Sequence, residues 1–384
     1  MSLTEESHAP AELPEAEAFT LIDADGNAVP VQQRRGYELP DLDMLKELYR
    51  RMVIARRWET QVTALTRQGR LSTYPSARGQ EASEIGTVMA MQETDWLFPT
   101  YRDSIAVGTR GVVTAELLSG FRGNWHCGWD PNEHRIAPQA TPLATQILHA
   151  VGLATAAKLK GDPIATVAFI GDGATSEGDA HEGFNFAGVW QAPTVFIIQN
   201  NQFAISVPIA KQTRARMLAD KAVGYGIPGY HVDGNDVAAV YAVVSEALER
   251  ARGGGGPTII ECLTYRIDPH TNSDDPSRYR DAADVEAWKT RDPVTRLEHY
   301  LKSEGALDDE LRQSIEDESE RIAAAMRDAM NQEPALDPME LFEHVYNEPR
   351  ASLVEQRDAL KAELDDANAH VHTHTHTHVE KRNS

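Results

Sequence analysis

The stretch from residue 166 to residue 208 constrains the fold of this chain more than any other. It contains two short apolar runs, TVAFI at residues 166–170 and TVFII at residues 194–198, separated by a segment of helical length. Such runs, rich in β-branched and aromatic residues, are typical of parallel strands buried on both faces. Gly-Asp-Gly follows the first run and Asn-Asn follows the second. Because ligands bind at the carboxyl ends of strands in open α/β sheets, we expect a binding site there.

The rest of the chain alternates between strand and helix patterns up to about residue 281. Helical spacing of apolar residues occurs at 42–66, 80–91, 142–160, 212–224 and 236–252, and strand-like runs occur at 230–232 and 257–265. This alternation predicts an α/β fold, a doubly wound parallel sheet with helices on both faces. Later segments are helical throughout, at 284–303, 308–330, 338–346 and 353–364.

Composition divides the chain into four regions. Residues 1–40 are rich in Ala, Glu and Pro without periodicity, which predicts a mobile arm or an extended wrap over a partner. Residues 41–300 form the main domain, and residues 301–368 form a C-terminal helical extension. Residues 369–384 alternate five histidines with Thr or Val, which predicts a disordered tail, with metal capture as the less favoured alternative.

Charge and cysteine content exclude several classes of protein. The chain has 37 Lys and Arg against 59 Asp and Glu, a net charge of −22, which argues against a nucleic-acid-binding face. No apolar run approaches the roughly 20 residues of a membrane span, and residues 1–14 lack the features of a signal peptide. Two cysteines suit a reducing compartment. We therefore expect a cytoplasmic protein that binds neither nucleic acid nor membrane.

An acid inside the glycine turn indicates a metal. Asp172, between Gly171 and Gly173, would repel a bare diphosphate, whereas dinucleotide fingerprints leave that turn uncharged. A bridging Mg²⁺ removes the repulsion, because it takes hard oxygen ligands from protein and phosphate alike. Asp172 offers a carboxylate, Asn201 an amide oxygen and Phe203 a backbone carbonyl. Either motif alone is equally consistent with a tight turn; their pairing after two buried strands favours the metal.

Six motifs together resemble one enzyme family. They are YPSARGQEA (74–82), TYRD (100–103), TPLATQ (141–146), GDGATSEGDAHEGFNFAGVW (171–190), NNQFAISVP (200–208) and TYRIDPHTNSDDPSRYR (264–280). The fourth and fifth resemble the thiamine-diphosphate signature. Over residues 42 to about 300, which include all six motifs, the chain resembles the alpha subunit of the decarboxylating component of 2-oxo acid dehydrogenase complexes. This implies a thiamine-diphosphate-binding fold with helical extensions at both ends, and transfer of an acyl group to the lipoyl group of an acyltransferase core.

The resemblance also implies roles for individual residues. Asp172, Asn201 and the Phe203 carbonyl would hold Mg²⁺, and His270 would be the catalytic residue that faces the substrate. The implied cofactor-binding residues are Tyr101, Arg102, Leu143, Gly171, Asp172, Gly173, Ala174, Glu177, Asn201, Arg266 and His270.

Three of these residues also have ordinary structural interpretations. Arg102 suits phosphate because its planar fork donates two hydrogen bonds; a surface salt bridge is the less favoured alternative. Leu143 could simply pack in the core. His270 can donate a proton near neutral pH, yet without the resemblance an exposed loop residue is the simpler interpretation.

The resemblance is incomplete at three points. Gln199 stands where some branched-chain members carry an arginine to the diphosphate. A potassium-binding turn is matched only partly, at Ala140, Pro142, Thr145 and Gln146. The glutamate that the cofactor's aminopyrimidine requires lies on a separate beta subunit in this family. The resemblance therefore implies an α2β2 heterotetramer, with helices 142–160 and 177–189 as interface candidates or, equally, as internal core.

The substrate is the least determined property. We favour branched-chain 2-oxo acids, with pyruvate as the main alternative and acetoin as a third. A hypothesis of another class is a cofactor-free assembly subunit that keeps the fold. The presence of Asp172, Asn201, Arg102 and His270 argues against it, since a degenerate copy should have lost some of them.

Overall fold

The computed structural model describes residues 11–123, 127–332, 337–343 and 345–380. Its centre is a sheet of five parallel strands in the order β1 (Trp96–Phe98), β2 (Thr166–Gly171), β3 (Thr194–Asn200), β7 (Thr258–Leu263) and β6 (Gly229–Asp233). The predicted α/β fold with a parallel sheet is confirmed. Thr166 pairs with Thr194 and Gly171 with Gln199, so the polar residues after β2 and β3 emerge at the same edge of the sheet.

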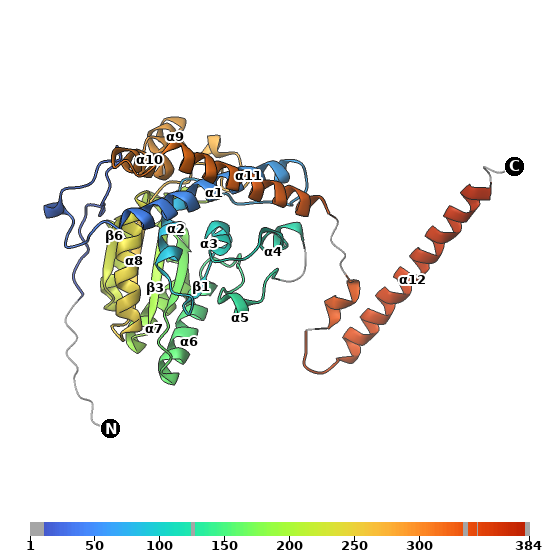
Figure 1. Cartoon of the computed structure of the whole chain (residues 1–384). Helices are drawn as coiled ribbons and strands as arrows, with labels where there is room; N and C mark the ends of the chain where they lie inside the picture. Colours follow the sequence, from blue (N-terminus) through green and yellow to red (C-terminus); the bar gives the residue numbers. More distant parts are fainter. Residues whose placement is uncertain (1–10, 124–126, 333–336, 344, 381–384) are drawn as a thin grey trace, which may run out of the picture. The chain divides into compact units, whose positions relative to one another are not determined.

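Helices cover both faces of this sheet (Figure 1). One face packs against α1 (Leu42–Arg67), α2 (Glu81–Ala90) and α8 (Val237–Arg252), through alternate residues such as Val167 and Phe169 of β2. The other face packs against α6 (Thr145–Lys160) and α7 (Gly178–Trp190), through Ala168 and Ile170 of the same strand. Because successive side chains of a strand point to opposite faces, a continuously apolar strand fills two cores.

Side-chain caps set the start of the long helices at their predicted positions. The Asp41 carboxylate accepts a hydrogen bond from the Met44 amide at 2.8 Å, and Asp236 caps α8 through the amides of Ala238 and Ala239. These bonds satisfy amide groups that have no partner within the first turn. α6 begins three residues later than predicted, because residues 141–144 form a turn in which Gln146 bonds the Leu143 carbonyl.

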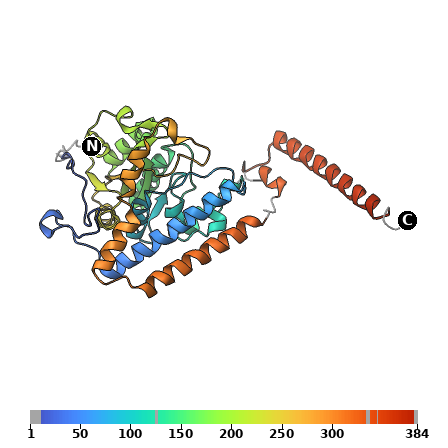
Figure 2. The same ribbon diagram turned by 90° about the horizontal axis from the view of Figure 1, so that it is seen from above.

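The helices after residue 281 differ from the prediction at one proline. Residues 284–303 are not one helix but two, α9 (Ala282–Lys289) and α10 (Pro293–Ser303). Pro293 has no amide hydrogen to continue α9, but it suits the first position of a new helix, which Asp292 caps. α11 (Asp309–Asn331) then runs beside α1, as seen from above in Figure 2, with Arg50 paired to Glu318 and Arg57 to Glu320.

Shorter elements complete this part of the chain. Residues 212–224, predicted as a helix, form no α-helix; a 3₁₀ helix, η5, covers Leu218–Tyr225 and buries Leu218, Ala219 and Ala222. The remaining elements are η1 (Val31–Gln33), α3 (Ser104–Thr109), α4 (Thr114–Leu117), η2 (Gly120–Arg122), α5 (Pro131–His134), η3 (Gly173–Ser176), β4 (Phe203–Ala204), β5 (Val207–Pro208), η4 (Ile209–Lys211) and η6 (Pro276–Arg278).

The described part of the N-terminal arm packs on its own chain, so the prediction of a mobile arm is wrong for these residues. Phe19 pairs with Val232 of β6, and Leu21 and Ile22 are buried. The buried Asp236 carboxylate accepts hydrogen bonds from Thr20 Oγ1 and from the amides of Leu21 and Ile22, at 2.6–2.8 Å. Residues 1–10 lie outside the described part.

The chain folds into two compact units, residues 1–331 and 332–384. Residues 301–331 therefore belong with the sheet, whereas the sequence suggests a boundary at residue 300. The second unit contains η7 (Pro338–Phe342), shorter than the predicted helix at 338–346, and α12 (Ala351–Glu380). α12 includes residues 369–380, for which the sequence predicts a disordered tail; no Gly or Pro interrupts the helix there.

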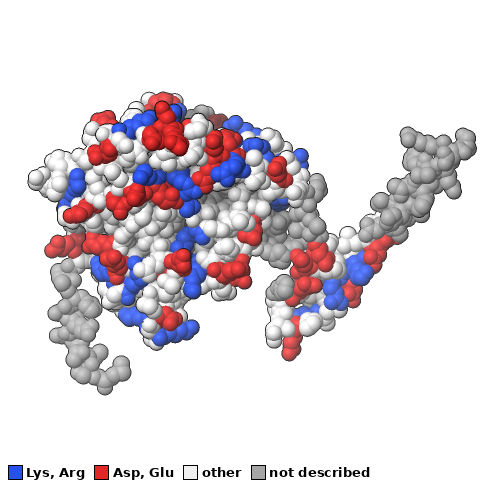
Figure 3. Space-filling model, viewed as in Figure 1, with Lys and Arg blue, Asp and Glu red and all other residues white. Residues whose placement is uncertain are grey.

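On the face seen in Figure 3, acidic and basic side chains are interspersed. Within the described ranges, no helix combines the length and the apolar character needed to cross a membrane.

Candidate functional site

One cavity of about 230 Å³ lies at the carboxyl ends of β2 and β3. All the residues predicted to bind cofactor or metal line it: Tyr101, Arg102, Leu143, Gly171, Asp172, Gly173, Ala174, Glu177, Asn201, Phe203, Arg266 and His270. Thr100, Ala140, Gln199, Ala204 and Ile205 complete the lining. The cavity thus brings together residues that are far apart in the sequence, from Thr100 to His270.

Asp172 follows β2 directly and is almost wholly buried. Its Oδ2 accepts a hydrogen bond of 2.6 Å from Gln212 Nε2. Burial raises the pKa of this carboxyl to about 6, although the bond from Gln212 opposes the shift. Burying a carboxylate is costly unless positive charge compensates it, so this position is suited to a metal ion.

Asn201 follows β3 and is also buried. Its Nδ2 donates to Gln80 Oε1 at 3.2 Å, while its Oδ1 is buried without a hydrogen-bond partner among the described residues. A buried acceptor left unpaired costs about 1–3 kcal/mol, so native structures rarely contain one without a reason. Coordination of a cation by Oδ1 would supply that reason, and the residue therefore fits a hard metal.

The Phe203 carbonyl lies in a hairpin formed by β4 and β5. Gln202 has φ of +76° and Ile205 has φ of +55°, so the chain turns sharply on either side of β4. The carbonyl accepts a hydrogen bond from Arg266 Nη1 at 3.1 Å. Because a carbonyl oxygen has two lone pairs, one remains for a metal.

Gly173 allows the two strand ends to approach each other. A Cβ atom at this position would lie 2.4 Å from Cβ of Ala204, in the β4–β5 hairpin. Any side chain would therefore push the turn after β2 away from the hairpin after β3. The glycine explains why Asp172 and Phe203 can line the same cavity.

Arg102 is buried, so the surface salt bridge considered for it is not what the structure contains. Its Nη1 donates to the Ser76 carbonyl at 2.7 Å, and its Nη2 lies within 3.1 Å of both Nδ1 and the carbonyl oxygen of His270. The ring of Tyr101 stands edge-on to the His270 ring, with centroids 6.1 Å apart. These contacts hold a cation at the cavity wall.

His270 is neutral at pH 7 in this setting. Burial lowers its pKa to about 4, and the positive charges of Arg102 and Arg266 add to the effect. A guanidinium can only donate hydrogen bonds, so Nδ1 of His270 must be the acceptor. The imidazole proton therefore resides on Nε2.

The loop from residue 266 to residue 280 is held by its own side chains. Arg266 donates to the Ile205 carbonyl at 2.6 Å and to the Tyr279 hydroxyl at 3.2 Å. The Asp274 carboxylate accepts hydrogen bonds from the His270 amide, at 2.9 Å, and from the Tyr279 hydroxyl. His270 thus belongs to a bonded loop.

Leu143 is 42% exposed and lines the cavity, which argues against simple core packing. Its carbonyl accepts a bond from Gln146 Nε2 at 3.2 Å, within the turn that partly matches a potassium site. Glu177 occupies the N-cap position of α7, after the 3₁₀ turn that contains Ala174.

Sequence reasoning missed Gln80 and Gln212, the partners of Asn201 and Asp172. Gln80 lies inside the RGQEA sequence of the first motif, so its position in that motif could have identified it as a site residue. Gln212 falls outside every motif.

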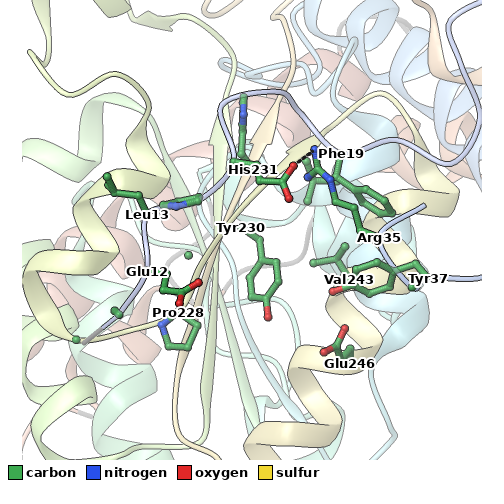
Figure 4. Close-up of a pocket in the computed structure, with 17 residues that line it drawn as sticks. Glu12, Leu13, Phe19, Arg35, Tyr37, Pro228, Tyr230, His231, Val243 and Glu246 are labelled. Carbon is green, nitrogen blue, oxygen red and sulfur yellow. Dashed lines mark ion pairs between the residues drawn. The ribbon is translucent and has the colours of Figure 1, made fainter. Parts of the chain in front are cut away.

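A larger cavity, of about 900 Å³, lies between the N-terminal arm and β6, as Figure 4 shows. None of the predicted site residues lines it. Several of its polar side chains already have partners: Arg35 pairs with Glu15 at 2.8 Å, and His231 bonds the Ala16 carbonyl. Its shape follows from the packing of the arm.

The profile of the family described as "Dehydrogenase E1 component" matches residues 49–338, most of the chain. The chain belongs to this family. The resemblance inferred from the six motifs is therefore confirmed at the level of the dehydrogenase E1 component.

Individual relatives agree with this assignment. The chain is 45% identical, over 91% of its length and 94% of the relative's, to the 3-methyl-2-oxobutanoate dehydrogenase subunit alpha of Mycobacterium tuberculosis. It is 38% identical to the 2-oxoisovalerate dehydrogenase subunit alpha of Bacillus subtilis, over 78% of this chain and 94% of the relative. The pyruvate dehydrogenase E1 component subunit alpha of the same organism is 39% identical, over 83% of this chain and 86% of that subunit.

Proposed function

We propose that this chain is the alpha subunit of a 2-oxo acid dehydrogenase, that it binds thiamine diphosphate through Mg²⁺, and that its substrate is a branched-chain 2-oxo acid such as 3-methyl-2-oxobutanoate. One observation carries the proposal: Asp172, Asn201 and Phe203 line a single cavity together with Arg102 and His270. The names of the Mycobacterium tuberculosis relative and of the first Bacillus subtilis relative support the substrate class.

Three oxygens would hold the metal: the Asp172 carboxylate, Asn201 Oδ1 and the Phe203 carbonyl. All are hard ligands of the kind Mg²⁺ prefers, and they leave positions for phosphate oxygens and water. The Arg102 guanidinium supplies charged donors for a diphosphate at the same wall. When bound, thiamine diphosphate supplies the electron sink that decarboxylation requires.

His270 would orient the substrate through the proton on its Nε2. Arg102 donates a hydrogen bond to Nδ1 of His270, and Asp274 accepts a hydrogen bond from the backbone amide of His270. These two contacts position both the ring and its loop. A neutral imidazole donates one hydrogen bond to a substrate oxygen without attracting the carboxylate as a full charge would. The ring therefore fits a residue that faces an acid losing its carboxylate as carbon dioxide.

A beta subunit would complete the site in an α2β2 heterotetramer. It would supply the glutamate for the cofactor's aminopyrimidine, and the acyl group would pass to the lipoyl group of an acyltransferase core. Large apolar side chains exposed on α6 and α7 support such an interface: Leu159, Phe186, Val189 and Trp190. The rings of Phe186 and Trp190 lie 4.6 Å apart, so these two exposed aromatic side chains adjoin each other.

Two further features belong to the proposal. A potassium ion would bind the turn of Ala140, Pro142, Thr145 and Gln146 through backbone carbonyls. We place the complex in the cytoplasm, in keeping with two cysteines, Cys127 and Cys262, that form no disulfide.

The second candidate substrate is pyruvate, which the 39% identical Bacillus subtilis relative supports; acetoin is a third. A cofactor-free assembly subunit is disfavoured by the unpaired Oδ1 of Asn201, since loss of the metal should release selection for a buried amide that nothing satisfies.

Decarboxylation by the chain co-expressed with a beta subunit tests the proposal. With Mg²⁺ and thiamine diphosphate present, we expect kcat/KM for 3-methyl-2-oxobutanoate to exceed that for pyruvate by about 10-fold or more, as pocket size differences of one or two carbons allow. A preference for pyruvate would favour the second candidate. Turnover of no 2-oxo acid by a complex that is folded would contradict the enzymatic function.

A further inference from the structure

Two glutamine side chains contact the two side chains assigned to the metal. Gln80 Oε1 accepts the Nδ2 hydrogen of Asn201 at 3.2 Å, and Gln212 Nε2 donates to Asp172 Oδ2 at 2.6 Å. Gln80 is wholly buried at the start of α2. Gln212 reaches the site from the segment after η4. Neither glutamine lines the cavity.

The contact of Gln80 extends to a carboxyl group. Its Nε2 donates to Glu84 Oε1 at 3.3 Å, and Glu84 Oε2 accepts the backbone amide of Ala106 at 3.0 Å. Both oxygens of Glu84 therefore receive N–H donors. Glu84 is itself wholly buried, so water does not compete for these bonds.

This chain of bonds determines which way each amide points. In the arrangement that the structure contains, Glu84 accepts the hydrogen bond, so Gln80 turns its NH₂ group toward Glu84 and its oxygen toward Asn201. Asn201 must then direct its NH₂ group toward Gln80, which leaves Oδ1 free and unpaired among the described residues. An amide in the reverse orientation would present hydrogens, which repel a cation, where an oxygen ligand is needed.

Gln212 fixes the other ligand relative to the hairpin after β3. Its Nε2 donates both to Asp172 Oδ2 and to the Val207 carbonyl, at 2.6 and 2.8 Å. Val207 belongs to β5, which pairs with the β4 strand that contains Phe203. One amide group thus ties the carboxylate after β2 to the hairpin that bears the carbonyl ligand.

We propose that Gln80 and Gln212 are positioning residues, with Glu84 behind Gln80, that orient the oxygens of Asn201 and Asp172 toward one cation. These roles rest on the proposed function. Groups that orient metal ligands typically change metal affinity by about 10- to 100-fold when they are removed. The effect acts on metal binding and leaves the reacting groups in place.

Magnesium titration of the complex with a beta subunit, at saturating thiamine diphosphate, tests these roles by calorimetry. For Gln80→Met and Gln212→Met we expect the Kd for Mg²⁺ to rise by about 10- to 100-fold. We also expect kcat at saturating Mg²⁺ to stay near that of the wild type, a split that a general loss of structure would not produce. Glu84→Gln, which preserves the shape of the side chain and replaces one accepting oxygen with an NH₂ donor, should raise the same Kd by a smaller factor.

Gln61→Met is the matched control. Gln61 is a buried glutamine of α1 that accepts a bond from Arg327 at 2.9 Å and lies outside the lining of the site. The complex with Gln61→Met should bind Mg²⁺ as the wild type does. If the wild type binds Mg²⁺, and Gln80→Met, Gln212→Met and Glu84→Gln bind it equally well, the positioning roles are wrong while the proposed function stands. If the wild type binds no Mg²⁺ with the cofactor, both are wrong.

Discussion

Nη2 of Arg102 lies 3.0 Å from Nδ1 of His270 and 3.1 Å from its carbonyl oxygen. This contact sets the tautomer of the imidazole, because the guanidinium offers only hydrogens. It also links the segment after β1 to the loop after β7, so that the residue proposed to bind phosphate and the residue proposed to face the substrate hold each other in place. A substitution of either residue should therefore alter the position of the other.

The first prediction concerns the charge of His270. With a pKa near 4, set mainly by burial and then by Arg102, the ring should stay neutral from pH 8 to about pH 5. The unfolded chain binds a proton near pH 6.5, so between about pH 4 and 6.5 it binds more protons than the native state, and this group makes stability rise with pH there. NMR of the imidazole should show an Nε2–H tautomer without titration near 6.5. A ring that titrates at 6.5 would contradict the contact.

The second prediction concerns Asp172, whose pKa burial raises to about 6. Metal binding requires the carboxylate, so protons should compete with Mg²⁺ below that pH. We expect the Kd for Mg²⁺ to rise about tenfold per pH unit below pH 6 and to level off above pH 7. Calorimetry at several pH values measures this. A Kd that stays constant between pH 5 and 7 would remove Asp172 from the metal site.

The third prediction concerns Gly173. A methyl group here meets Ala204 Cβ at 2.4 Å, so Gly173→Ala should force the turn and the hairpin apart. We expect a loss of about 1–3 kcal/mol in the free energy of unfolding, together with weaker cofactor binding. Gly224→Ala is the control, since nothing lies within 4 Å of its Cβ position. Equal denaturation midpoints for the two variants would show that the approach is not tight.

The fourth prediction separates binding from packing at Leu143. Because this side chain is 42% exposed, Leu143→Ala should change the free energy of unfolding by less than about 0.5 kcal/mol. Cofactor affinity or kcat should nonetheless fall, since the side chain lines the cavity. Leu42→Ala, at 39% exposure on α1, should leave both unchanged. A destabilised Leu143→Ala with normal activity would restore the core-packing interpretation.

Much of the fold could be predicted because the strands are continuous apolar runs bounded by polar turns. β2 and β3 appear where TVAFI and TVFII stand, and α1 and α8 begin behind the acids that cap them. The arm could not be predicted, because its order depends on a distant acid, Asp236, rather than on local periodicity. The division between α9 and α10 depends on Pro293, whose effect competes with a helical pattern on both sides.

The residues that line the site could be predicted from the sequence, whereas the residues that form hydrogen bonds to them could not. Residues that line the cavity occur in motifs directly after strands, where topology brings them together. Gln80 contacts Asn201, 121 positions away, and Gln212 contacts Asp172, 40 positions away, each through one hydrogen bond. A side-chain amide has no periodicity or spacing that would identify such a bond, so only the three-dimensional arrangement assigns it.

The most direct test of the account is the binding of thiamine diphosphate to the complex with a beta subunit, measured calorimetrically with and without Mg²⁺, in the wild type and in Asp172→Ala. We predict tight binding only for the wild type with Mg²⁺, because Asp172 and Asn201 act on the diphosphate through the metal. Equal affinity with and without Mg²⁺, or full affinity in Asp172→Ala, would contradict it.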